Sequence, residues 1–493
     1  MRKALSFLCS VILFGYTIAA CSGGSGSMSM TPTPSAGMTN VSLSIGDAPP
    51  TNVTILRFEM QVTAASLQPA DPMQAAVSLL KGPTEVELEH LQTEPAFLAN
   101  MSVPAGSYNG LSATFSNPQM TILNQSTQTL TVGTQSCAPN EVCNLTPPLN
   151  SMSVSVEAPT APFPITLASK SPLALLLHFD INASVQGDLS ISPTISLTQV
   201  PALPSGEFEH FHVIGSVNAI NSPNFTLQPV FGSQALTIAT DGNTTYDFGT
   251  SCSMDNFSCI ATGQFLKVRV KLMSDGTLLA TEVKLFEASG NVTLQGVVIS
   301  SAASQNQFQV VLEFMDDEGH QFGQVSPGFN LTIQPDAMAT FAIDADGVTL
   351  PSGLSFASVQ DISVGQVVRL HPTLPVTIGS MGQITVGADA VTLEASEITG
   401  TVAAVNTSAM PPNFMLGGLP SLLTKANITQ LEVEPAMGTD FENVSGLSAL
   451  NVNDTVSVAG LLFNTSSGPV VIAERVEKRQ PEGSGGMGMM LRH

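Results

Sequence analysis

The chain is 493 residues long and carries 38 acidic against 15 basic side chains, which gives a net charge of −23. This length exceeds what one hydrophobic core supports, so it predicts several domains. The acidic balance repels phosphate backbones and argues against nucleic acid as a partner.

Residues 1–20 have the pattern of an export signal. Arg2 and Lys3 precede an apolar run over 4–16, which is too short to span a bilayer. Residues 18–21, Ile-Ala-Ala-Cys, resemble the lipobox of bacterial lipoproteins. This resemblance implies cleavage before Cys21 and attachment of lipid to its sulfur. An ordinary secretory signal with a coincidental cysteine, or an uncleaved helix, are the alternatives.

The lipid would place the chain in the bacterial cell envelope, with the membrane as one partner and other envelope proteins as further candidates. Ser22 after the cysteine favours the outer membrane, facing either the periplasm or the cell surface. Residues 21–39 are small, polar, proline-containing and uncharged, so they predict a flexible tether.

The rest of the chain has the two-residue period of half-buried strands. Apolar and small polar residues alternate in runs such as 41–50, 291–300 and 453–462, and turn residues separate these runs. No long segment has a helical period. The expected fold class is therefore all-β.

Residues 40–200 form the first predicted domain. A strand that leads into Asp47-Ala-Pro, a Pro-Ala-Gly-Ser-Tyr element at 104–108 and Leu-Leu-His-Phe-Asp at 176–180 follow one another here. This order resembles domain of unknown function family 4382. The resemblance implies a β-sandwich and an envelope location but no activity. We expect Asp47 to cap a turn.

Three copies of one smaller domain follow, at 208–288, 289–395 and 396–478. Five landmarks recur in the same order, beginning with Gly215, Gly296 and Gly400. The pattern resembles domain of unknown function family 5666. Five or six short strands per copy suit a small closed barrel, of which the OB-like barrel is one form. Each copy is expected to bury its own core, and 479–493 is expected to be a disordered tail.

Four cysteines remain after Cys9 leaves with the signal and Cys21 takes lipid. Three pairings are open, but Cys137 with Cys143 and Cys252 with Cys259 each lie within one short polar segment. An exported chain meets an oxidising compartment, which favours these two disulfides. Each ring would contribute about 2.4 kcal/mol by loop closure, enough to fix a loop.

Residues with possible chemistry are few. His210 and His212 would share one strand face and are weak metal candidates without a third ligand. His178 and Asp180 are also same-face neighbours, in a run apolar enough to favour a hydrogen-bonded structural histidine. Residues 315–320, Met-Asp-Asp-Glu-Gly-His, could offer oxygen ligands to calcium, but a solvated hairpin tip is favoured.

No catalytic motif or cofactor site is predicted. The leading hypothesis is a non-enzymatic, lipid-anchored envelope protein with a structural, adhesion or scaffolding role. The alternatives are a ligand- or solute-binding lipoprotein that uses a cleft between domains, and a hydrolase whose residues converge only in space.

Overall fold

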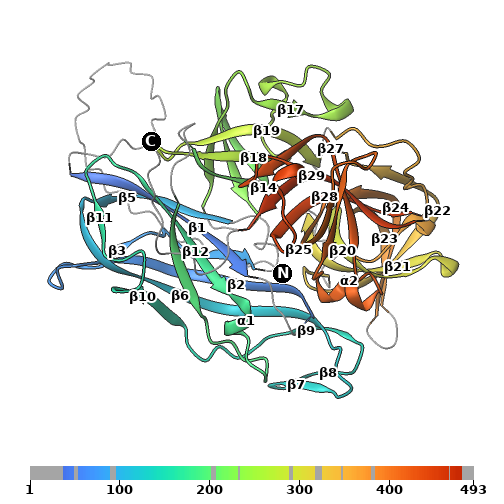
Figure 1. The fold of residues 1–493 in the computed structure, drawn as a ribbon, viewed down its shortest axis with the longest axis horizontal. Coiled ribbons are helices and arrows are strands. Elements are labelled where there is room, and N and C mark those ends of the chain that lie inside the picture. The colour runs from blue at the N-terminus through green and yellow to red at the C-terminus, as the bar shows by residue number, and fades with distance from the viewer. Residues whose placement is uncertain are drawn as a thin grey trace, which may run out of the picture. The chain divides into compact units, whose positions relative to one another are not determined.

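The computed structural model describes residues 37–48, 54–88, 96–200, 207–230, 234–287, 292–316, 325–345, 348–378, 383–465 and 467–479, which are almost entirely β (Figure 1). The predicted leader, Cys21 and most of the tether and tail lie outside these ranges. Two boundary residues differ from expectation. Met38 already begins the first strand, and Arg479 donates from its backbone to the carbonyl of Thr455, at 2.9 Å.

Residues 38–200 form a β-sandwich, as predicted. One sheet has the order β13 (Ile195–Val200), β12 (Leu173–Asp180), β1 (Met38–Ala48), β5 (Ala96–Pro104). The other has the order β10 (Ser153–Glu157), β6 (Gly106–Leu123), β2 (Thr54–Pro69), β3 (Val77–Ser78). In addition, β4 (Thr84–Glu87) pairs with β2, and both β9 (Val142–Leu145) and β11 (Ile165–Leu167) pair with β6. A small hairpin of β7 (Leu130–Val132) and β8 (Gln135–Cys137) and the short helix α1 (Ile181–Ser184) complete the region.

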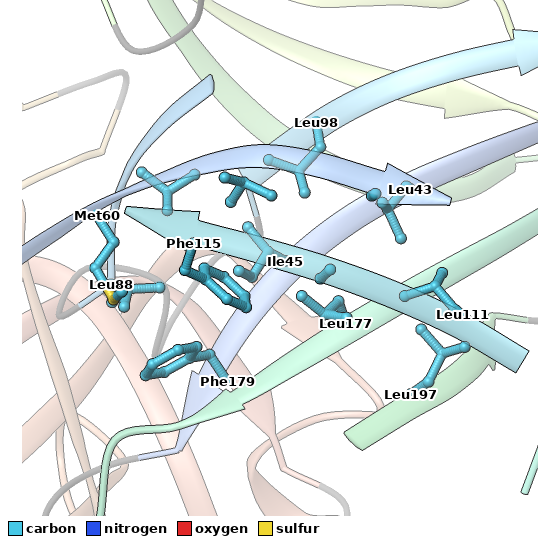
Figure 2. Packing of buried hydrophobic residues seen from close by; sticks show 14 of the residues in the cluster. Leu43, Ile45, Met60, Leu88, Leu98, Leu111, Phe115, Leu177, Phe179 and Leu197 are labelled. Carbon is cyan, nitrogen blue, oxygen red and sulfur yellow. The ribbon is translucent and has the colours of Figure 1, made fainter. Parts of the chain in front are cut away.

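The sandwich core lies between the two sheets. Alternate residues of β1 and β12, such as Leu43, Ile45, Leu177 and Phe179, meet Phe115 and its neighbours from the second sheet (Figure 2). Phe179 contacts the Phe115 ring edge-on, with centroids 5.4 Å apart. The two-residue period of the sequence therefore marks the inner face of each sheet.

The first barrel comprises β14 (Glu207–Asn221), β15 (Asn224–Pro229), β16 (Leu236–Ala239), β17 (Thr245–Asp247), β18 (Phe265–Met273) and β19 (Leu278–Glu287). These strands form a six-stranded sheet in the order β16-β15-β14-β18-β19-β17, and an additional pairing of β16 with β19 closes the circuit. In β18 the buried Leu266, Val268, Val270 and Leu272 alternate with half-buried cations.

The other two repeats are closed five-stranded barrels. The second barrel has the order β20 (Thr293–Ala302), β21 (Gln307–Asp316), β22 (Asn330–Ile343), β24 (Ile384–Glu394), β23 (Val367–Ile378). The third has β25 (Ser396–Asn406), β26 (Asn413–Gly417), β27 (Leu431–Glu442), β29 (Gly468–Lys478), β28 (Thr455–Thr465), with the short helix α2 (Ser421–Lys425) after β26. In all three repeats the third strand thus runs parallel to the last, which is an OB-like barrel.

The recurring glycines have a common structural reason. A Cβ on Gly215, Gly296 or Gly400 would lie 2.1, 2.4 or 2.7 Å from a carbonyl oxygen of the next strand, so no side chain fits there. Two residues later the register of each first strand shifts, at Val217, Val298 and Val402. Such bulges bend a strand enough for it to pair with neighbours on both sides of a small barrel.

The expectation that each copy buries its own core holds only in part for the second and third barrels. Leu461, Phe463, Val470 and Ile472 belong to the third barrel, yet they pack in the core cluster of the second. The side-chain amide of Gln366 in the second barrel also donates to the carbonyl of Leu462, at 2.8 Å. All the described elements belong to one compact unit.

Candidate functional site

Both predicted disulfides are present. Cys137 at the end of β8 joins Cys143 in β9, with Cα atoms 5.7 Å apart. Cys252 joins Cys259 at 5.8 Å across two 3₁₀ turns, Gly249–Ser251 and Phe257–Cys259. Cys137 and Cys259 are buried, so both bridges anchor surface loops to a core.

The two metal candidates lie on β14. The backbone of His210 is opposite Lys271, and that of His212 is opposite Arg269. Only His212 has a described side chain, and it is half-buried. Cationic cross-strand neighbours oppose metal binding here. Within the described ranges no group of three or more His, Cys, Asp or Glu side chains is placed to hold a metal ion.

His178 and Asp180 have separate structural contacts. A ring nitrogen of His178, Nε2, lies 3.0 Å from Thr198 Oγ1 on the adjacent β13. Burial lowers the pKa of His178, and the charge of Arg479 lowers it further. Asp180 caps α1 by accepting a hydrogen bond from the backbone of Ala183, at 2.9 Å. His178 is thus half-buried and hydrogen-bonded, in agreement with the structural histidine that the sequence favours.

Several other predicted residues fall outside what the structure describes. Cys21 and residues 317–320 of the acidic hairpin are among them. Asp47 is a strand residue whose backbone pairs with Phe179, but its side chain is not among the described groups.

The structure instead gathers charge where the modules meet. Arg57 on β2 is 3% exposed and forms an ion pair with Glu59. Glu59 lies directly opposite Glu87, whose Oε1 accepts a 2.7 Å hydrogen bond from the backbone of Phe58. Burial lowers the pKa of Arg57, while the carboxylates of Glu87, Glu313 and Glu85 act in the opposite direction. Because Glu313 lies on β21, this cluster extends from the sandwich to the second barrel.

A second charged cluster joins the first and second barrels. Lys284 on β19 forms an ion pair with Asp344, and Arg369 Nη2 on β23 lies 3.1 Å from the other oxygen of Asp344. Arg369 Nε lies 2.7 Å from Oε1 of the buried Glu394. Burial raises the pKa of Glu394, although the nearby Arg369 lowers it.

Aromatic side chains cover this second cluster. Arg369 Nη1 donates a 2.7 Å hydrogen bond to the carbonyl of Phe286, and the guanidinium carbon lies 5.2 Å from the centre of the Phe286 ring. Phe265 and Phe286 of the first barrel meet Phe314 of the second at centroid distances of 5.4 and 5.5 Å. Apolar cover excludes water and strengthens the ion pairs beneath it.

Two further contacts involve the first barrel. Arg269 Nη2 lies 3.1 Å from Asp440 Oδ2 and 3.7 Å from Glu442 Oε1, both on β27 of the third barrel. On the sandwich side, Asn40 and Asn100 donate side-chain hydrogen bonds to the carbonyls of Asp275 and Gly276, at 3.1 and 3.0 Å.

Opposite charges lie side by side within each of these clusters. Each described cation in them is paired with a carboxylate. Sequence reasoning missed these contacts. The available signal was the cationic alternation Lys267, Arg269, Lys271 in a strand of an acidic chain.

The comparisons with known proteins agree with part of the sequence reading. Residues 214–284 match the model of the domain of unknown function DUF5666. No curated protein matches the chain. No helix within the described ranges is long and apolar enough to cross a membrane.

Two solved structures show weak similarity. One is a Drosophila protein, Unr CSD456, at 10% identity and a TM-score of 0.12, covering 55% of this chain and 98% of that one. The other is a multidomain protein with nucleic acid binding domains from Streptococcus pneumoniae TIGR4, at 9% identity and a TM-score of 0.10, covering 55% of this chain and 73% of that one. Scores this low carry no argument about function.

Proposed function

We propose that this chain is a non-enzymatic, lipid-anchored protein of the bacterial cell envelope with a structural, adhesion or scaffolding role. Cys21 is the proposed lipid site, and residues 40–200 are proposed to be a domain of family 4382. The observation that supports a scaffold is the set of contacts between modules. Cations that are scarce in the whole chain, such as Arg57, Arg269, Lys284 and Arg369, lie at these contacts.

A scaffold benefits from modules that hold fixed positions. Paired charges under aromatic cover, together with a core shared by two barrels, resist the hinge motion that independent domains show by default. The side chains that fill these contacts leave less room for the solute-binding alternative, which needs a cleft between modules. The acidic charge of −23 disfavours nucleic acid.

The anchor is tested by Cys21→Ser in the full chain. Diacylated cysteine holds a protein to a membrane because each buried methylene contributes about 0.8 kcal/mol. We expect the wild type in the detergent-soluble membrane fraction and Cys21→Ser in the soluble fraction or unprocessed, with the expected lipid mass on the wild-type peptide alone. An unmodified Cys21 thiol in the wild type would contradict the anchor.

The scaffold role is tested by recovering the acylated protein, after cross-linking, from its own envelope fraction. A defined envelope protein in stoichiometric amount, enriched over Cys21→Ser, would support it. Recovery of a small molecule alone would replace it with the solute-binding alternative.

A further inference from the structure

Asparagine is distributed unusually in this chain. Of 25 asparagines, 16 begin an Asn-x-Ser/Thr triplet in which x is not proline. Serine and threonine make up 98 of the 493 residues, so chance placement would give about 5 such triplets. This triplet is the acceptor sequence for N-linked glycans in exported proteins.

The triplets differ in whether their asparagine is exposed. Of the 14 whose asparagine is described, eight have an exposed asparagine, and five of those eight lie in the third barrel. The other six asparagines are buried or half-buried. Asn40 and Asn100 are two of them, and both hold the first barrel through the hydrogen bonds described above.

Local structure explains some of the exposed triplets without any modification. Asn256 and Asn406 each accept a hydrogen bond from the serine hydroxyl two residues later, at 2.7 and 3.1 Å. Such turns require an asparagine followed by a hydroxyl at this spacing. These two positions therefore carry no independent signal.

Left-handed backbone conformation explains an asparagine but not the hydroxyl that follows. Six of the asparagines that the structure describes have this conformation. Asn117, Asn140 and Asn306 lack Ser or Thr two residues later, whereas Asn427, Asn443 and Asn453 of the third barrel all have it. The side chain of Asn443 donates to Glu477 Oε1, at 3.4 Å. Asn427 and Asn453 are exposed, as are the hydroxyl residues Thr429 and Thr455.

The repeats supply an internal comparison for Asn453. Its backbone donates to the carbonyl of Val402, as Gly263 does to Val217 and Gly365 to Val298, and all three residues have positive φ. Asparagine is the usual substitute for glycine in this conformation. Two residues later the first and second barrels have Phe265 and Val367, so the barrel fold does not require the hydroxyl of Thr455.

We propose that Asn427 and Asn453 are acceptors of N-linked glycans on the third barrel. The donor class is a lipid-linked oligosaccharide diphosphate. A bond forms from Nδ2 of the asparagine to C1 of the first sugar, the bond from C1 to the diphosphate oxygen breaks, the lipid diphosphate leaves and Nδ2 loses one proton to a base. The proposal rests on export of the chain but not on the lipid anchor or on the scaffold role.

The test is mass spectrometry of the full chain purified from its native envelope, with Thr455→Ser and Thr455→Val as matched variants. We expect a glycan on the peptides of Asn427 and Asn453 and unmodified Asn124, which is buried. Thr455→Ser should keep the glycan on Asn453. Thr455→Val, which introduces the residue of the second barrel, should lose it at Asn453 alone.

The same spectra separate this proposal from the anchor. Unmodified Asn427 and Asn453 on a chain that carries lipid at Cys21 would overturn the glycan proposal and leave the anchor standing. Glycans at these asparagines on a chain without lipid would support the glycan proposal and overturn the anchor. Retention of the Asn453 glycan in Thr455→Val would also overturn the proposal, because glycan attachment would then not depend on the hydroxyl residue of the triplet.

Discussion

Single residues contribute to the contacts between modules, and at Glu394 ion pairing and burial have opposite effects. Its carboxylate is buried beside Arg369, so it gains an ion pair but loses water. Burial is the larger effect and raises its pKa. Removing one partner of a buried ion pair usually destabilises a protein, because the remaining charge loses its compensation.

Glu394→Gln is therefore expected to change the pH dependence of stability. A carboxyl whose pKa is raised in the fold contributes stability that is present below its unfolded pKa and is lost as pH rises through the folded value. Glutamine does not titrate, so the free energy of unfolding of the variant relative to wild type should increase with pH. Urea unfolding from pH 4 to pH 8 measures this, with the exposed Glu157→Gln as the control. An identical difference at every pH would contradict it.

At the scale of elements, the turn between β18 and β19 is a contact point. Gly276 has φ +87°, and a Cβ there would lie 2.1 Å from Asn100 Nδ2 of the sandwich. Gly263 has nearly the same φ, +86°, but a Cβ there would have no neighbour within 4 Å. Comparing substitutions at these two glycines therefore separates the effect of backbone strain from the effect of contact with the sandwich.

Gly276→Ala should destabilise more than Gly263→Ala. Both carry a strain of about 1 kcal/mol from an alanine at positive φ. The contact with Asn100 adds to this strain in Gly276→Ala, for a total of about 2–4 kcal/mol. Thermal unfolding of both variants measures the gap. Equal losses would show that Asn100 moves away without cost.

The strand pattern and the repeats could be predicted from the sequence, whereas the contacts between modules could not. Alternation in β18 identified its buried face because burial follows the strand period. Gln264 and Gln366 each follow the positive-φ glycine of their barrel, and each side-chain oxygen accepts a hydrogen bond from the backbone of the residue three before it, at 2.6 and 2.8 Å.

The residues of the charged clusters come from strands far apart in sequence. Lys284 and Arg369 meet at Asp344 only after two barrels have formed, so no local pattern indicates the meeting. The sharing of Phe463 between barrels was missed for the same reason. An apolar residue predicts burial, but it does not show which core buries it.

For the whole molecule, the shared core predicts that the second and third barrels unfold together. Phe463 lies on β28 of the third barrel but is 1% exposed within the core cluster of the second. Truncating a buried phenylalanine to alanine costs about 3–5 kcal/mol. Phe463→Ala should therefore speed hydrogen exchange of backbone amides in β20–β24 as much as in its own barrel.

Phe414→Ala is the matched control, because Phe414 is fully buried within the third barrel's own cluster. If the two barrels form one cooperative unit, both variants raise exchange in both barrels to a similar extent, since each then lowers the same global free energy. If the shared residues are in contact but do not couple the unfolding of the two barrels, Phe414→Ala raises hydrogen exchange in the third barrel alone. Phe463→Ala then affects only the amides beside it. That second pattern would contradict a single unit, and with it the fixed arrangement on which a scaffold role depends.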